Sequence, residues 1–219
     1  MKLMDLSAFN CPKPKTLPTG QNLKPNNIIG KDDLRYLLVG QVVVEEKMDG
    51  TMVKFASMDP ELVIFAEDLK RRRSIFYQLP GRYSIFEIYN VKRGVFLDSE
   101  EKISLSNEMR RGKIKIPEIE PVLFFPTPRI ATGKFALEEL LQFVGESAYA
   151  RGSEDKHPVP GEGIVVKQFA DNFPIDFVTG KIISEGFPSA VIGSYLQLPY
   201  MQNVVDPSLP LVIDIPRKQ

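Results

Sequence analysis

The chain has 219 residues with 28 basic and 28 acidic side chains, so its formal net charge is zero. This length suits one domain with at most a small appendage, and the balanced charge argues against nucleic-acid binding through bulk positive charge. One cysteine, Cys11, excludes an intrachain disulfide, and one histidine leaves too few ligands for a Cys/His zinc cluster. No segment is apolar enough to span a bilayer or act as a signal peptide, which predicts a soluble cytoplasmic protein without membrane association.

The N-terminal two thirds of the chain is rich in short strand signals. The first 30 residues hold four prolines and predict an irregular lead-in that wraps a surface. Apolar residues at helical spacing predict one amphipathic helix, from Leu137 to Ala148. β-branched and aromatic runs predict strands at 42–44, 51–56, 61–66, 83–90, 95–97 and 122–125, with a turn at 58–60.

The remainder of the chain predicts two further strands and a tail. A Gly/Pro-rich loop at 152–161 leads into a strand at 163–168, and a last strand is expected at 176–184. We assign no regular structure to the Pro-rich tail, residues 189–219. Strands dominate without regular alternation with helices, which predicts an α+β domain over residues 31–188 with largely antiparallel sheets.

The segment from Glu45 to Thr51 is the strongest candidate for chemistry. Lys47 follows a strand that looks buried, and Gly50 allows a tight turn after Asp49. A lysine is a poor nucleophile at its usual pKa of about 10.4, but desolvation or a nearby cation lowers the pKa and frees the lone pair. Lys47 is therefore a candidate nucleophile for attack on phosphorus. Taken alone, the segment also fits a polar hairpin turn with an exposed lysine.

Four segments in order along the chain resemble the motifs of covalent nucleotidyltransferases, the superfamily of ligases and capping enzymes. The segments are Lys47-Met48-Asp49-Gly50, Phe65-Ala66-Glu67-Asp68-Leu69, Phe86-Glu87-Ile88-Tyr89-Asn90 and Glu162-Gly163-Ile164-Val165-Val166-Lys167. The best match is the ATP-dependent RNA ligases of the RNA ligase 2-like group, whose third motif is followed by a run similar to Ser74–Tyr77 and Leu79-Pro80. The resemblance covers roughly residues 13–187 and implies a nucleotidyltransferase (ATP-grasp-like) domain, with two largely antiparallel sheets and flanking helices around a nucleotide cleft.

The resemblance implies a role for each matching residue near the nucleophile. Lys47 would form a covalent lysyl-AMP, and Asp49 would support its turn. Glu46 would contact the adenine edge, Glu67 would hold the ribose hydroxyls, and Phe86 would stack on the adenine. Two of these residues also have an ordinary interpretation, because Phe86 could pack in the core and Glu67 could be a solvated acid at a strand end.

The fourth and fifth motifs imply the phosphate and metal contacts. Glu162 would bind Mg²⁺, which prefers carboxylate and phosphate oxygens, and Lys181 would touch the α-phosphate. Glu162 and Lys167 fall on opposite faces of a regular strand, so both serve the cleft only if Glu162 precedes that strand. The expected substrates are ATP and the broken or nicked ends of RNA, and the function implied is strand joining through an adenylated 5′-phosphate, as in RNA repair.

Three departures from the family pattern keep alternatives open. The family has an arginine that contacts the nucleotide or the RNA between the positions of Asp49 and Glu67. This chain has no arginine there, although it has Lys54. Thr179 stands where the fifth motif usually has a second basic residue. The region after that motif is shorter than the family's C-terminal domain, which implies a partner protein or domain in its place. A non-catalytic relative that binds nucleotide or RNA, and a DNA ligase or capping-type enzyme, are the alternatives.

Two short basic runs are candidate RNA contacts. They are Lys70-Arg71-Arg72-Arg73 and Arg110-Arg111-Gly112-Lys113. Each is equally compatible with a phosphate-binding surface and with a solvated loop.

Overall fold

The computed structural model describes residues 5–19, 27–58, 61–71, 73, 75–151, 160–168, 178–185, 187 and 202–215. Its helices, with η for a 3-10 helix, are η1 (Leu6–Ala8), α1 (Lys31–Val39), α2 (Ser99–Arg110), η3 (Pro121–Leu123), α3 (Leu137–Leu140) and η4 (Leu141–Phe143). Its strands are β1 (Lys15–Thr16), β2 (Val42–Glu46), β3 (Thr51–Met58), β4 (Glu61–Asp68), β5 (Gln78–Leu79), β6 (Tyr83–Asn90), β7 (Val95–Phe96), β8 (Phe124–Pro126), β9 (Arg129–Gly133), β10 (Gly163–Gln168), β11 (Thr179–Ile183) and β12 (Val204–Val205).

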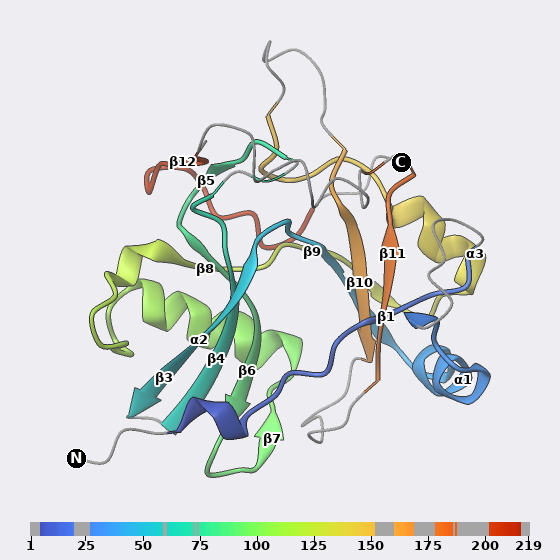
Figure 1. Cartoon of the computed structure of the whole chain (residues 1–219), viewed down its shortest axis with the longest axis horizontal. Coiled ribbons are helices and arrows are strands. Elements are labelled where there is room, and N and C mark those ends of the chain that lie inside the picture. Colours follow the sequence, from blue (N-terminus) through green and yellow to red (C-terminus); the bar gives the residue numbers. More distant parts are fainter. Residues whose placement is uncertain are drawn as a thin grey trace.

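Two five-stranded sheets form the body of the protein (Figure 1). The first, here called the β2 sheet, has the order β1-β11-β10-β2-β9, and the second, the β4 sheet, has the order β3-β4-β6-β7 with β8 beside β6. Neighbouring strands are antiparallel except for the pairs β1/β11 and β6/β8. The α+β class with largely antiparallel sheets is thus confirmed.

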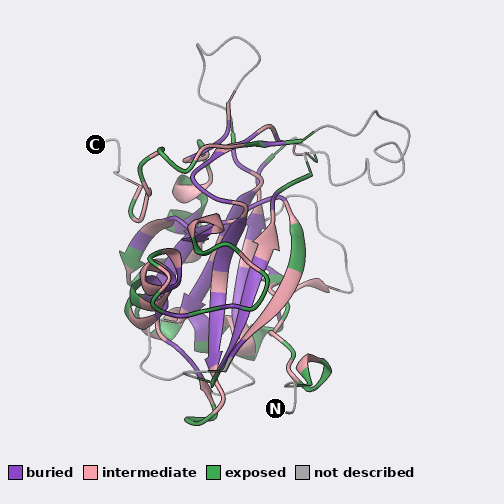
Figure 2. Cartoon of the chain, turned by 90° about the vertical axis from the view of Figure 1, so that its left-hand side faces the viewer, coloured by how far each residue is buried: buried purple, intermediate pink, exposed green. Residues whose placement is uncertain are grey.

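Each sheet has its own apolar core. Many strand residues are buried, as the purple segments of Figure 2 show. The core of the β2 sheet includes Val44, Ile164 and Ile182, and α1 contributes Leu37 to it. The core of the β4 sheet lies against α2. Burying such β-branched and aromatic side chains supplies the main driving force for these strands. The uninterrupted burial of β2 explains why its sequence predicted a strand so clearly.

The helices differ from those expected. The predicted helix from Leu137 to Ala148 is wrong in length, because α3 ends at Leu140 and continues only as the 3-10 turn η4. The backbone becomes extended at Val144, directly before Gly145, and glycine is a poor helix former. Two longer helices, α1 and α2, were not predicted at all.

Both ends of the described chain are more ordered than expected. The N-terminal lead-in contains η1 and β1, and β1 pairs in parallel with β11. Within the tail, β12 pairs in parallel with β5, and the Asp214 carboxylate accepts from Arg129 Nε (2.6 Å). The tail therefore contributes structure where the sequence indicated none.

Several expected features lie partly or wholly outside the described residues. These are the turn at 58–60, the loop at 152–161, the beginning of the last strand, and residues Arg72 and Ser74. Among the described residues, no helix combines the length and the apolar character needed to cross a bilayer.

Candidate active site

Lys47 lies in the short connection between β2 and β3. Its backbone N–H donates to the carbonyl oxygen of Gly163 (2.9 Å), because β2 pairs with β10. Its side-chain nitrogen Nζ lies 2.5 Å from Oε1 of Glu162, and the two side chains keep 22% and 12% of their surfaces exposed. A cation and a carboxylate from neighbouring strands therefore meet at a position that solvent still reaches.

Two glycines allow this approach. Gly163 has a φ of 151°, and a Cβ there would lie 2.0 Å from the carbonyl oxygen of Ile182. A Cβ on Gly50 would lie 3.0 Å from Cβ of Glu67. Only glycine tolerates both the backbone conformation at the first site and the contact at the second. β10 begins at Gly163, so Glu162 precedes the regular strand. Glu162 is therefore not bound by the strand's alternation and can face the same side as Lys167.

Glu67 lies near the end of β4 and is electrostatically coupled to the Lys47–Glu162 pair. Burial raises the pKa of its carboxyl group to about 7, and the charge of Lys47 counteracts this only partly. Its Oε2 atom is buried and has no hydrogen-bond partner among the described residues. An acid that titrates near neutral pH and has an open acceptor is more typical of a binding site than of packing.

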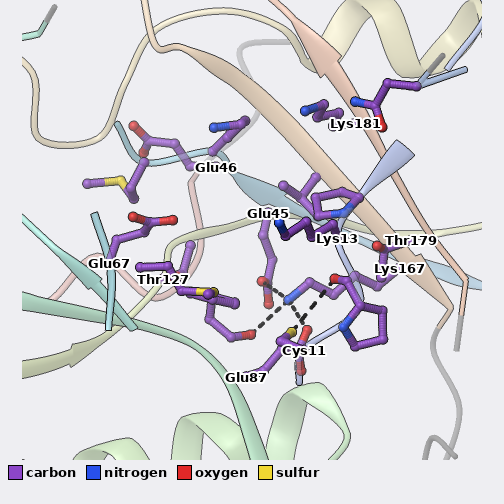
Figure 3. Close-up of a pocket in the computed structure, with 18 residues that line it drawn as sticks. Cys11, Lys13, Glu45, Glu46, Glu67, Glu87, Thr127, Lys167, Thr179 and Lys181 are labelled. Atoms are coloured by element: carbon purple, nitrogen blue, oxygen red, sulfur yellow. Dashed lines mark hydrogen bonds and ion pairs between the residues drawn. The ribbon is translucent and has the colours of Figure 1, made fainter. Parts of the chain in front are cut away.

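A cleft of about 300 Å³ lies between the two sheets and next to these residues (Figure 3). Of the residues that the sequence predicted for the site, those lining the cleft are Glu46, Lys47, Glu67, Phe86, Lys167 and Lys181. Glu162 does not line the cleft, but it pairs with Lys47, which does. Asp49 also does not line the cleft and is buried. The structure thus brings residues from β2, β4, β6, β10 and β11 to one place, although they are far apart in the sequence.

Glu46 and Asp49 are both held by the protein itself. Oε2 of Glu46 accepts from the backbone N–H of Ala148 (3.0 Å), and burial raises the pKa of the carboxyl group to about 7. The backbone N–H of Asp49 donates to the hydroxyl of Tyr77 (3.1 Å), which fixes the turn after Lys47. This hydrogen bond involves only the backbone of Asp49, so the role of its side chain and the adenine contact of Glu46 both stay predictions.

Lys181 and Thr179 both line the cleft from β11. The charge of Lys181 helps to counteract the rise in the pKa of Glu162 that burial causes. Thr179 is buried, and its hydroxyl has no hydrogen-bond partner among the described residues. Thr179, which departs from the family pattern, therefore lines the cleft with an uncharged side chain.

A group of buried charges forms the floor of the cleft and was not predicted. It consists of Glu45, Glu87, Lys102 and Lys167, here called the buried ion cluster, and Figure 3 shows Glu45, Glu87 and Lys167. Nζ of Lys167 lies 2.6 Å from Oε2 of Glu45 and 2.6 Å from Oε1 of Glu87, and Lys102 also pairs with Glu45. Both lysines donate to the carbonyl oxygen of Phe86, at 2.8 and 3.2 Å.

The buried ion cluster gives Lys167 partners within the protein. Burial alone would lower the pKa of Lys167, but the carboxylates of Glu45 and Glu87 together raise it above its ordinary value. The cluster joins β2 and β10 of one sheet to β6 and α2 of the other. Two acids at a strand end, Glu45-Glu46, were the only sequence signal for it, and nothing in the sequence marked Lys102 as buried.

The candidate RNA-contacting residues divide into two kinds. The guanidinium group of Arg110 donates to the carbonyl oxygens of Pro80 (3.0 Å) and Phe124 (3.2 Å), and also to those of Val122 and Pro207, so it acts as a structural anchor. Arg73, in contrast, is exposed, donates to the hydroxyl of Thr51 (2.7 Å) and lowers the pKa of Glu67 through its charge. Arg73 thus lies closer to the candidate site than its place in the sequence suggested.

Lys54 was the one basic residue between Asp49 and Glu67. Its ammonium group donates to the carbonyl oxygens of Phe9 (2.5 Å) and Leu6 (3.3 Å). Lys54 therefore holds the N-terminal segment and does not take the place of the arginine that the family pattern has in this region.

The acids of the site fit a divalent ion that shares its ligands with a nucleotide. In the part of the chain that the structure describes, no three acidic, histidine or cysteine side chains are grouped to hold a metal by themselves. Glu162, however, has a buried Oε2 atom without a hydrogen-bond partner among those residues. Mg²⁺ commonly takes one or two carboxylates together with water and substrate phosphate oxygens. The donor set fits such a shared ion, with Glu162 as the protein ligand.

Comparison with known proteins gives matches only at the level of structure. No family model matches the sequence, and no curated protein matches it. The RNA ligase of Naegleria gruberi matches as a mutant with AMP and Mn, at 15% identity and a TM-score of 0.51, and as a mutant with ATP and Mn, at 14% and 0.51. The same ligase with pyrophosphate matches at 16% and 0.51.

In each of these three comparisons the match covers 82% of this chain and 57% of the ligase. The chain thus spans a little over half the length of the solved proteins it matches. At such low identity the likeness concerns the fold and not the activity. The chain has the nucleotidyltransferase fold of the RNA ligases, as its ordered motifs predicted.

Proposed function

We propose that this chain is an ATP-dependent adenylyltransferase of the RNA ligase type, which forms a lysyl-AMP at Lys47 and passes the AMP to a polynucleotide 5′-phosphate. The observation that carries the proposal is the Lys47–Glu162 pair, 2.5 Å apart, beside a cleft of about 300 Å³. A cleft of this volume is large enough for a small ligand. The fold shared with RNA ligases supports nucleotide chemistry in this cleft.

In the proposed first step, Nζ of Lys47 attacks the α-phosphorus of ATP. An N–P bond forms, the bond from the α-phosphorus to the bridging oxygen breaks, and pyrophosphate leaves with the electron pair. The lysine must first lose a proton, because an ammonium group is not a nucleophile. Glu162 lies within hydrogen-bond distance of Nζ of Lys47 and is a candidate acceptor for that proton.

The other residues of the site position the nucleotide. Glu67 would accept from the ribose hydroxyls, Phe86 would stack on the adenine, and Glu46 would contact the base edge. Lys181 would place a fixed positive charge near the α-phosphate, where negative charge builds in the transition state. Glu162 would hold Mg²⁺ together with phosphate oxygens, and the ion would neutralise that same charge.

The later steps rest on the likeness to RNA ligases. AMP would pass from Lys47 to the 5′-phosphate of an RNA end, with cleavage of the N–P bond and formation of a pyrophosphate link. A 3′-hydroxyl would then attack the 5′-phosphate and release AMP, which joins the two strands. The solved ligases that support this proposal are longer than the region matched here.

A non-catalytic relative that binds nucleotide or RNA is the second candidate. Two observations favour it. Thr179 leaves the fifth motif with one basic residue, and Lys54 is taken up by backbone carbonyls of the N-terminal segment. Both reduce the positive charge available to a triphosphate.

The decisive experiment is intact mass spectrometry of the purified chain after incubation with ATP and Mg²⁺. We expect a gain of one AMP that is absent in Lys47→Ala. The same reaction with GTP tests the choice of base, and nicked RNA and DNA duplexes test which ends are joined. A folded wild-type protein that binds ATP without gaining AMP would favour the non-catalytic candidate.

A further inference from the structure

The N-terminal segment crosses from one sheet to the other (Figure 1), and several of its residues line the cleft. We call residues 9–16 the strap. At its first end, the carbonyl oxygen of Phe9 accepts from Lys54 (2.5 Å), and the Phe9 ring packs against Tyr89 with 5.5 Å between the ring centres. At its other end, β1 pairs with β11, and the next residue, Leu17, donates its N–H to the carbonyl oxygen of Lys181 (2.9 Å). The strap is therefore fixed at both ends.

Between these two anchors, the strap supplies one wall of the cleft. Cys11, Pro12, Lys13 and Pro14 all line it, and Figure 3 shows the Lys13 side chain among the other lining residues. Two prolines flank Lys13, and their fixed φ angles restrict the backbone there. Lys13 is exposed, and its ammonium group makes no hydrogen bond or ion pair with the described residues. The strap thus presents a cation to the cleft in a defined place.

The cleft contains little spare positive charge for a triphosphate. Lys167 is engaged by two carboxylates of the buried ion cluster, and Lys47 pairs with Glu162. On β11 the position of Thr179 carries no charge. The lining residues comprise as many lysines (Lys13, Lys47, Lys167 and Lys181) as glutamates (Glu45, Glu46, Glu67 and Glu87).

We propose that Lys13 is a nucleotide-binding residue that contacts the phosphate groups of ATP and supplies the positive charge that Thr179 does not. The proposal rests on the proposed function of the cleft. The register of β1 supports it, because Thr16 pairs with Lys181 and so fixes the strap beside the strand that carries the predicted phosphate contact. A lysine binds phosphate as a compact point charge, which needs no preformed fork of donors.

The test compares Lys13→Gln with Lys15→Gln. Lys15 lies two residues along the strap, but it does not line the cleft and pairs with Asp33 (2.9 Å) at the surface, which makes it a matched control. Binding is measured by calorimetry with the α,β-methylene analogue of ATP, which cannot transfer AMP, and with adenosine. For Lys13→Gln we expect roughly tenfold weaker binding of the analogue and unchanged binding of adenosine, as the loss of one charge-assisted contact predicts. Lys15→Gln should bind both ligands as the wild type does, and Lys13→Arg should restore most of the affinity.

Three results with the variants would overturn the assignment of Lys13. They are equal binding of the analogue by Lys13→Gln and wild type, an equal loss in Lys15→Gln, and a parallel loss of adenosine binding. The absence of any binding of the analogue to the wild type would also overturn it. A wild type that binds the analogue but never gains AMP from ATP would contradict the adenylation chemistry and leave the role of Lys13 standing.

Discussion

The cleft contains two kinds of lysine–glutamate pair that lie close together and differ in burial. In the pair Lys47–Glu162, the two side chains keep 22% and 12% of their surfaces exposed, and each has one charged partner at short distance. In the buried ion cluster, no side chain exceeds 7%, and Glu45 and Lys167 each have two charged partners. β2 leads to both, because Glu45 lies within it and Lys47 directly follows it.

In our proposal, this difference in burial and partners separates a reactive lysine from structural ones. A buried ion is costly unless its partners compensate it fully. The carboxylates of Glu45 and Glu87 raise the pKa of Lys167 and hold it as a cation, whereas burial lowers the pKa of Lys102 although it pairs with Glu45. Among the described residues, Lys47 has one ion-pair partner, Glu162, and it remains accessible to a ligand. The same residue types therefore serve architecture at the floor of the cleft and, in our proposal, chemistry at its edge.

The largest effect is expected from a change at the edge of the cleft. Lys47→Arg keeps the positive charge but removes the nucleophilic amine, so the rate of AMP transfer to the protein should fall by about 10³-fold or more. Radiolabelled AMP incorporation measures this rate. The thermal unfolding midpoint should change little, because Lys47 is partly exposed. Retained labelling in the arginine variant would show that another residue is modified, and the contrast between Lys47 and the buried ion cluster would then not explain the reaction.

A change at the floor of the cleft should act on stability instead. Lys167→Met leaves Glu45 and Glu87 with an uncompensated buried charge, which should lower the free energy of unfolding by about 3–5 kcal/mol. Lys115→Met, at an exposed lysine, is the control and should change stability by less than about 0.5 kcal/mol. Denaturant unfolding gives both values. If Lys167→Met weakened ATP binding without loss of stability, Lys167 would belong to the nucleotide site, as its motif implies.

Glu162→Gln should reduce adenylation by about 10²-fold, since the amide can accept neither a proton nor a metal ion as well as the carboxylate does. The effect should be smaller than that of Lys47→Arg because the nucleophile remains. Single-turnover kinetics over a range of Mg²⁺ concentrations measure it, with Glu120→Gln at an exposed site as the control. An unchanged rate at every Mg²⁺ concentration would remove Glu162 from the proposed mechanism.

The smallest effect concerns the pH dependence of stability. Burial raises the pKa of Glu46 to about 7 in the folded protein, from 4.5 for a free side chain. The folded state therefore holds more protons than the unfolded state between these values, and the free energy of unfolding should fall as the pH rises from about 5 to about 8. Glu46→Gln should flatten this dependence by about 1–3 kcal/mol. An equally steep decline in the variant would assign the dependence to other groups, such as Glu67.

The strands of the site could be predicted from the sequence because their residues are buried on both faces. β2, β4, β6 and β10 all coincide with β-branched or aromatic runs, and the motif residues attached to them lie around one cleft. The order of the motifs also predicted the fold that the solved RNA ligases share. Short-range pattern and motif order were sufficient here because the motif residues lie in or next to the buried strands.

The helix α2 could not be predicted because its buried face is partly polar. In α2, the buried positions include Ser99, Lys102 and Ser106, where the apolar pattern of an amphipathic helix would need hydrophobic residues. Lys102 is buried only because Glu45, far away in the sequence, compensates its charge. The short strands β1 and β12 were missed for a similar reason, because both depend on pairing with strands that are distant in the sequence.

The most direct test of the account is to locate AMP on the wild-type chain by peptide mapping after incubation with ATP and Mg²⁺. The account predicts modification of Lys47 alone, with Lys102 and Lys167 unmodified because both side chains are buried within the buried ion cluster. AMP on one of the buried lysines, or no modification of a folded protein that binds ATP, would contradict it.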